Sequence, residues 1–178
     1  MSRRAAELEP TPFALRRGQE LSALVGHGSP LVLGRAARVG LPPAELFAFI
    51  VDFERLPEWM PMMKRCRVDN AQAREPGGVG AVRVIDSGIG QPTRETVMAF
   101  EPPQLLAYSA DDASLRGLFT RHLGVLVCEP HPQGGSWLSW LSYAQPGSGP
   151  QKFFGPSVFK LVVQQSLSRL AQRFPVGG

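Results

Sequence analysis

Between residues 65 and 144 the sequence is a succession of short strand-like segments set at close intervals. Turn residues such as Glu75–Pro76–Gly77–Gly78 and Glu101–Pro102–Pro103 separate these segments, and no helix-length stretch lies between them. Connections this short favour antiparallel hairpins over parallel units joined by helices. The segments are Arg65–Gln72, Val79–Asp86, Thr93–Phe100, Leu105–Ser109, Thr120–Glu129 and Ser136–Ala144. With Leu31–Val39 upstream, the sequence predicts about seven strands in one antiparallel sheet.

Two helical regions bracket this strand-rich stretch. Pro42–Pro43 is typical of a helix start, and a short helix carrying Leu46, Phe47, Ile50 and Val51 at helical spacing follows it. A second, shorter turn is built around Leu56–Pro61. The last helix runs over 150–174, with one apolar face made of Phe159, Val163, Ser166, Leu167, Leu170 and Phe174. Pro156 either begins or kinks that helix. The order β-α-α-β6-α predicts an α+β fold with its helices on one side of the sheet.

The first 30 residues differ from the rest and form an N-terminal extension to a domain that we place at 31–175. Phe13, Leu15, Leu21 and Leu24 support a weak helix, which Gly18 interrupts at a cost of ~1 kcal/mol relative to alanine. We expect this extension to be mobile or docked on a neighbour.

Composition excludes several classes of protein. The net charge of +4 comes from arginines scattered along the chain rather than gathered in a stripe, which argues against a nucleic-acid partner. No apolar run approaches the ~18 residues of a transmembrane segment, and we expect a cytoplasmic location. Cys66 and Cys128 share no close spacing and are expected to be buried thiols.

The chain resembles a known superfamily through a series of short motifs. They are Pro43–Phe47, Asp52–Phe53 with Leu56–Pro61, Gly78–Arg83, Arg94–Val97, and Phe100–Pro103 with Leu105–Tyr108. In this order they are similar to the START-related superfamily, which includes polyketide cyclases, lipid-transport proteins and birch-pollen-allergen-like proteins. The resemblance implies a helix-grip fold: a curved sheet wrapped around the C-terminal helix, with an apolar cavity between them. It implies a hydrophobic small-molecule partner, such as a lipid, a quinone or a polyketide. We expect no cofactor.

Glu95 and Arg83 are the first candidate site residues. Strand alternation places Thr93, Glu95, Val97 and Ala99 on one face, and in the superfamily a glutamate like Glu95 often points into the cavity. By the same resemblance Arg83 is its ionic partner. Glu95 would orient a polar end of a ligand, or exchange a proton if burial raised its pKa. The alternative is an exposed cross-strand pair that contributes well under ~1 kcal/mol.

His122 is the second catalytic candidate, because the superfamily often places a polar residue at the cavity mouth there. It would act as a general base or as a hydrogen-bonding group, although a structural histidine is the more common case. Cys128 and His131 have a spacing that suggests a metal, but two ligands fall short of the four of a tetrahedral zinc site. We therefore predict no metal centre.

Apolar and aromatic side chains complete the expected ligand site: Tyr108, Phe119, Trp140, Phe159 and Val163. Trp137 and Trp140 have opposite strand parity, so one faces inward and the other is a candidate for a homodimer contact or for cover by the N-terminal extension. Leu115 and Leu118, in the loop before Phe119, would shield a ligand or pack permanently.

The predicted function is binding or transport of a hydrophobic or aromatic small molecule in an internal cavity. One alternative is a polyketide cyclase or aromatase that uses His122 or Glu95 for proton transfer. The other is an interaction module whose core is filled by side chains.

Overall fold

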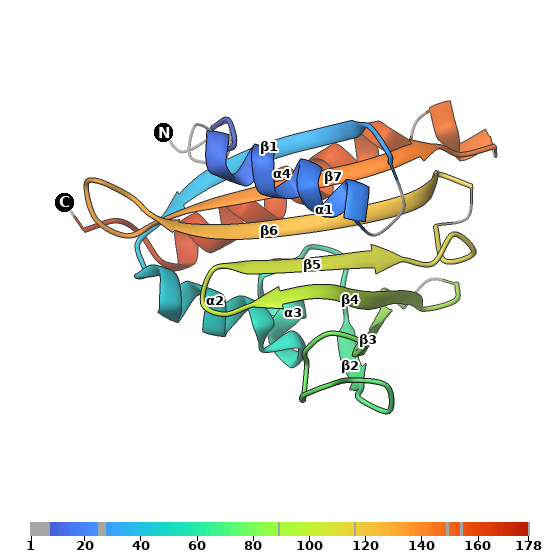
Figure 1. The fold of residues 1–178 in the computed structure, drawn as a ribbon, viewed down its shortest axis with the longest axis horizontal. Coiled ribbons are helices and arrows are strands. Elements are labelled where there is room, and N and C mark those ends of the chain that lie inside the picture. The colour runs from blue at the N-terminus through green and yellow to red at the C-terminus, as the bar shows by residue number, and fades with distance from the viewer. Residues whose placement is uncertain are drawn as a thin grey trace.

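The computed structural model describes residues 8–24, 28–88, 90–115, 117–148, 150–153 and 155–177, and its centre is one antiparallel sheet (Figure 1). Seven strands are hydrogen-bonded in the order β1-β7-β6-β5-β4-β3-β2. Their bounds are β1 Leu31–Val39, β2 Arg65–Asp69, β3 Val82–Asp86, β4 Thr93–Glu101, β5 Leu105–Ala110, β6 Phe119–Pro130 and β7 Ser136–Pro146. Strands β2 to β7 pair in chain order, and β1 pairs with β7. The predicted antiparallel hairpins are confirmed.

Strands β2 and β3 are shorter than predicted because polar turns replace their ends. Asp69 Oδ1 accepts a hydrogen bond from the Ala71 amide at 3.0 Å, and this side-chain turn ends β2 at Asp69 instead of Gln72. Gly80 lies at φ 91°, and the Ala81 amide donates to the Gly78 carbonyl at 2.9 Å. The chain is therefore turning where the extended pattern predicted the start of β3.

Five helical segments lie on the concave face of the sheet or beside it. They are α2 Pro43–Val51, η1 Phe53–Arg55, α3 Leu56–Trp59, η2 Pro150–Phe153 and α4 Gly155–Arg173. The long helix α4 runs behind the sheet in Figure 1, with α2 and α3 below it. Pro156 is the second residue of α4, so it begins the helix and does not kink it. No helix among the described residues is long and apolar enough to cross a membrane.

The apolar face of α4 is buried over only part of its length. Val163, Ser166, Leu167 and Leu170 are fully buried against the sheet. In the first turns of the helix, Val158 and Leu161 remain 51% and 52% exposed, and Phe159 is half-buried. Apolar side chains at the N-terminal end of α4 are therefore less buried than those further along the helix.

Helix α1, Pro12–Leu24, lies on the opposite, convex face, in front of the sheet in Figure 1. Its Ala14 and Leu21 pack on a second apolar cluster, formed by Leu105, Ala107, Leu123, Val125, Val127, Leu141 and Tyr143. Thr11 begins this helix: its hydroxyl accepts from the Ala14 amide and donates to Glu129 of β6. The helices of the predicted β-α-α-β6-α order lie on one side of the sheet, whereas α1, from the N-terminal extension, packs on the other.

A β-bulge in β4 corrects one strand-face prediction. The pairing register between β4 and β5 shifts between Val97 and Ala99. Val97 packs in the inner core, whereas Ala99 packs against the outer cluster, so the two do not share a face as alternation predicted. The extra residue in the bulge reverses the alternation. Glu95 precedes the bulge and keeps its inward direction.

The two tryptophans of β7 face opposite ways, as their parity predicts. Trp140 is 2% exposed and packs edge-on against Trp59, with ring centroids 5.9 Å apart. Trp137 is half-buried and stacks on His131 at 5.2 Å and 4°. Trp140 is therefore part of the inner core, and a homodimer contact through Trp137 stays a prediction.

Gly18 permits the close approach of α1 to β7, which supplies a first prediction. A Cβ at this position would lie 2.6 Å from Tyr143 Oη and 2.7 Å from Leu141 Cδ1. We expect Gly18→Val to lower the free energy of unfolding by about 1–3 kcal/mol because of this overlap. Helix propensity alone predicts the opposite sign, since valine is a better helix former than glycine.

Urea denaturation of the full chain measures this effect. Gln19→Val, on the exposed side of the same helix, is the matched control and should change the free energy of unfolding by less than about 0.5 kcal/mol. Equal stability of the two variants would show that α1 does not pack on the sheet at Gly18.

Candidate functional site

The centre of the candidate site is a buried ion pair on neighbouring strands. Arg83 of β3 and Glu95 of β4 are register partners. Arg83 Nη2 donates a hydrogen bond to Glu95 Oε2 at 2.5 Å, and the two side chains are only 3% and 13% exposed. The pair is thus inside the protein, in contrast to the exposed cross-strand alternative. A buried charge of either sign needs such a partner, since an isolated one is strongly destabilising.

Two aromatic rings enclose the Arg83 guanidinium. Its Cζ lies 4.1 Å from the centroid of the Tyr108 ring and 4.9 Å from that of Phe53. Phe53 belongs to η1, directly after α2, and Tyr108 belongs to β5. The planar guanidinium suits this position because it can lie against aromatic rings while keeping its charge. The rings and Glu95 together hold Arg83 in place.

Gly124 makes room for Tyr108. The two residues are register partners across β5 and β6, and a Cβ on Gly124 would lie 2.3 Å from Tyr108 Cζ. The Tyr108 ring therefore crosses the position that any other side chain would occupy. This explains a glycine in the middle of a long, otherwise bulky strand.

His122 is brought to the same region by an irregularity in β6. Arg121 has a φ of 52°, and the pairing with β7 shifts register between Thr120 and Leu123. The Ser29 hydroxyl donates to the Arg121 carbonyl at 3.1 Å. The His122 ring is 2% exposed, with its centroid 5.9 Å from that of Tyr108 and 6.0 Å from that of Phe159.

Burial governs the protonation of these groups. It raises the pKa of Glu95, and the charge and hydrogen bond of Arg83 oppose that rise. Burial also raises the pKa of the Tyr108 phenol, and the negative charge of the nearby Glu95 carboxylate raises it further. The phenol therefore keeps its proton. The pKa of the Cys66 thiol is raised to about 11 for the same reason, and this thiol is not a ready nucleophile.

A cavity of about 380 Å³ lies next to the ion pair, and we call it the Glu95 cavity. Its volume is at the lower end of the range for small-molecule pockets, about 300–1,000 Å³. Strands β3 and β4, the end of α3, the loop before β6 and the first turns of α4 all contribute walls. The lining residues are Met60, Met63, Ile85, Thr93, Glu95, Leu115, Leu118, Gly155, Val158, Phe159 and Val162.

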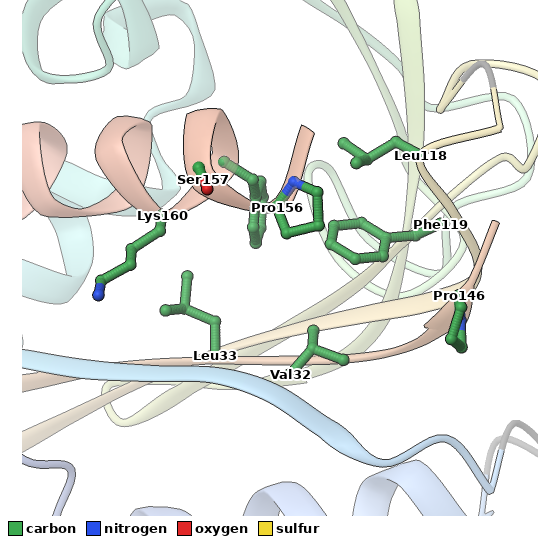
Figure 2. A pocket seen from close by; sticks show the side chains of 9 residues that line it. Val32, Leu33, Leu118, Phe119, Pro146, Pro156, Ser157 and Lys160 are labelled. Atoms are coloured by element: carbon green, nitrogen blue, oxygen red, sulfur yellow. The ribbon is translucent and has the colours of Figure 1, made fainter. Parts of the chain in front are cut away.

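A second cavity, of about 420 Å³, lies on the other side of Phe159 and Leu118, which line both. We call it the Phe119 cavity. Figure 2 shows Val32 and Leu33 of β1 across from Pro156 and Phe119. Phe119 and Phe159 pack edge-on with ring centroids 5.6 Å apart. Pro146, Ser157 and Lys160 complete the lining.

The structure brings most of the predicted site residues together. Glu95, Arg83, Tyr108, His122 and Phe159 form one connected group, in which Glu95 and Phe159 line the Glu95 cavity. The other three predicted residues adjoin this group: Phe119 packs against Phe159, and Trp140 and Val163 belong to the same inner core as Tyr108. Phe119 lines the second cavity, Trp140 packs on Trp59, and Val163 is fully buried in the inner core.

Several lining residues were missed by sequence reasoning. Met60 and Met63 end the α3 turn, and Val158 and Val162 lie on the side of α4 next to the predicted apolar face. Methionine is a flexible apolar side chain that often lines adaptable pockets, which was an available signal. Val162 could not be distinguished from Val163 by helical spacing, because both adjoin the same face.

The described residues offer no clear metal ligands. Cys128 is buried in the inner core, whereas His131 stacks on Trp137 at the outer face. In the part of the chain that the structure describes, no group of three or more His, Cys, Asp or Glu side chains converges.

Comparison with known proteins places this geometry in context. A family model described as "Polyketide cyclase / dehydrase and lipid transport" matches residues 34–175. No curated protein matches the chain. The match begins within β1, so helix α1 lies outside it.

Solved structures share the fold at low sequence identity. The protein XoxI from Bacillus cereus is 19% identical, with a TM-score of 0.65 over 80% of this chain and 94% of its own. Ara h 8.0201 is 15% identical, with a TM-score of 0.58 over 79% of this chain and 97% of its own. The di-domain ARO/CYC protein StfQ from the steffimycin biosynthetic pathway is 19% identical, with a TM-score of 0.60 over 81% of this chain and 50% of its own.

The buried ion pair generates a second prediction, on the pH dependence of stability. In Arg83→Met the pKa of Glu95 rises further, because the cation that opposes the effect of burial is gone. A carboxyl with a higher pKa in the folded protein than in the unfolded chain stabilises the fold at low pH. That stability is lost as the pH rises through the folded pKa. We expect Arg83→Met to cost about 3–5 kcal/mol at pH 7 and much less near pH 4.

Urea denaturation across this pH range measures the effect. Arg83→Met/Glu95→Gln is the matched control, and its free energy of unfolding should lack the decline with pH that the single variant shows. The same pH slope in both variants would mean that Glu95 is not the titrating group.

Proposed function

Because the chain belongs to the polyketide cyclase/dehydrase and lipid transport family, we propose that its Glu95 cavity binds a hydrophobic or aromatic small molecule. The observation that carries the proposal is a cavity with an almost entirely apolar lining and one buried carboxylate in its wall. Apolar burial would supply affinity at ~25 cal/mol per Å². Glu95 would orient the polar end of the ligand.

The arrangement of the polar groups supports binding more than a reaction. Arg83 is enclosed by Tyr108, Phe53 and Glu95, so it holds the carboxylate and does not itself line the cavity. His122 is buried between Tyr108 and Phe159 and lines neither of the two cavities. Glu95 is then the one acid–base group among the described residues that line the Glu95 cavity.

A cyclase is the second candidate, and one observation favours it. Glu95 lines the cavity, and burial raises its pKa above the ordinary value of a glutamate, which is the direction that suits a proton-exchanging carboxyl. In such an enzyme Glu95 would move a proton on a bound poly-β-ketone, and the cavity walls would set the fold of the chain. This candidate uses the same site, so it requires the same binding step.

Blocking the cavity tests the proposed function. Val162 lines the Glu95 cavity from α4, and Val162→Trp would fill much of the space. We expect this variant to bind the neutral fluorescent probe N-phenyl-1-naphthylamine at least about tenfold more weakly, since the contacts that exclude water are lost. Fluorescence titration measures the dissociation constant.

The adjacent position supplies the control. Leu161 is 52% exposed, so Leu161→Trp adds the same side chain outside the cavity and should leave probe affinity unchanged. Equal binding by both variants and the unchanged protein, or no binding by any of them, would contradict the proposed function.

A further inference from the structure

The polarity of the Glu95 cavity is concentrated at one place. Among the described residues that line it, Glu95 is the only charged one and Thr93 is the only one with a hydroxyl group. The remaining side chains are aliphatic, aromatic or thioether groups, supplied by Met60, Met63, Ile85, Leu115, Leu118, Val158, Phe159 and Val162. A ligand that places a polar group in this cavity therefore meets one anchor.

The anchor can accept hydrogen bonds but offers no positive charge. Arg83 donates to one oxygen of Glu95, and a carboxylate has about four lone-pair sites, so most of its accepting capacity remains. The Arg83 cation is 3% exposed, lies against the rings of Phe53 and Tyr108, and is not among the described residues that line the cavity. Its guanidinium stabilises Glu95 and is not presented to the cavity.

A ligand group that donates a hydrogen bond and a ligand carboxylate would therefore interact with Glu95 in opposite ways. A ligand hydroxyl or N–H would donate to Glu95, and hydrogen bonds to a buried charged acceptor are among the strongest in proteins. A ligand carboxylate would lie beside a like charge, with no cation or strong donor among the described lining residues to replace its water. Burying an unpaired charge of this kind is costly.

We propose that the Glu95 cavity takes a neutral ligand with a hydroxyl or N–H donor at one end of an apolar or aromatic skeleton, and rejects ligands that end in a carboxylate. This inference rests on the proposed function and specifies its ligand class. It separates phenols, alcohols and enols, which the cavity binds, from fatty acids and other organic anions, which it does not.

The size and walls of the cavity add to this specification. A volume of about 380 Å³ suits a compact ligand of a few fused rings or a short chain. Met60, Met63 and Phe159 offer polarisable surfaces for an aromatic skeleton, since thioether sulfur and ring edges both contact π systems favourably. The donor end would then lie at Glu95, with the skeleton between α4 and the α3 turn.

Competition between matched ligands tests the inference. 2-Naphthol and 2-naphthoate share a ring system and differ in the polar end, and each would be titrated at pH 7.5 against bound N-phenyl-1-naphthylamine. Because this probe is expected to lose binding in Val162→Trp, its displacement reports on the Glu95 cavity and not on the Phe119 cavity, which Lys160 lines. We expect 2-naphthol to bind at least about thirtyfold more tightly than 2-naphthoate.

Two variants test whether Glu95 causes the preference for 2-naphthol over 2-naphthoate. Glu95→Gln removes the charge and should reduce the preference to within about threefold, chiefly through tighter binding of 2-naphthoate. Thr93→Val, the matched change at the other polar lining residue, should keep the preference. Loss of the preference in Thr93→Val but not in Glu95→Gln would overturn the assignment to Glu95.

The possible results distinguish a failure of the proposed ligand class from a failure of the proposed binding function. Equal binding of 2-naphthol and 2-naphthoate by the unchanged protein, or a preference for 2-naphthoate, overturns the ligand class while the binding function stands. Failure of the probe and both naphthalenes to bind overturns both. The comparison in the unchanged protein is decisive even if a variant fails to fold.

Discussion

The cavity inside this protein exists because helix α4 contacts the curved sheet over only part of its length. The apolar face of the helix is fully buried at Val163, Leu167 and Leu170, whereas Val158 and Phe159 in its first turns are less buried and line the cavity. Met60 and Met63 from the α3 turn and Leu115 and Leu118 from the loop before β6 enclose the remaining space. Apolar side chains left partly unpacked at this end would gain contacts from a bound ligand, as they would from any filling of a void. The Glu95 cavity is therefore a consequence of where the helix lies.

The Arg83–Glu95 pair is the polar counterpart of this arrangement. Burying two charges is costly, and the contact at 2.5 Å and the two rings around the guanidinium offset that cost only while all members are present. The cluster joins the neighbouring strands β3, β4 and β5 to η1, so this part of the sheet and the turn after α2 depend on it. Because the carboxylate lines the cavity and Arg83 is not among its described lining residues, the same cluster would determine which ligand ends are accepted.

Local sequence patterns predicted most of the fold. Turn residues between apolar runs located all seven strands, Pro42–Pro43 marked a helix start, and the resemblance to the START-related superfamily is confirmed. Whether Pro156 begins or kinks the last helix was left open by the sequence. The features that the sequence did not predict depend on contacts between distant parts of the chain. The bulge after Val97 places Ala99 on the other face of the sheet. A strict inward–outward alternation along the sequence does not predict where a strand carries an extra residue. The position of α1 depends on a close contact at Gly18 with β7. Glu95 and Arg83 were found through the family resemblance, whereas Val162 and the methionines depend on the exact path of α4.

Methyl NMR of the methionines is the most direct test of a ligand in the Glu95 cavity. Met60 and Met63 line it, Met62 between them is 62% exposed, and Met98 packs at the outer face of the sheet. With the chain labelled at its methionine methyl groups, added 2-naphthol should shift the Met60 and Met63 signals and leave those of Met62 and Met98 in place. Shifts confined to Met62 or Met98, or no shifts at saturating ligand, would contradict binding in this cavity.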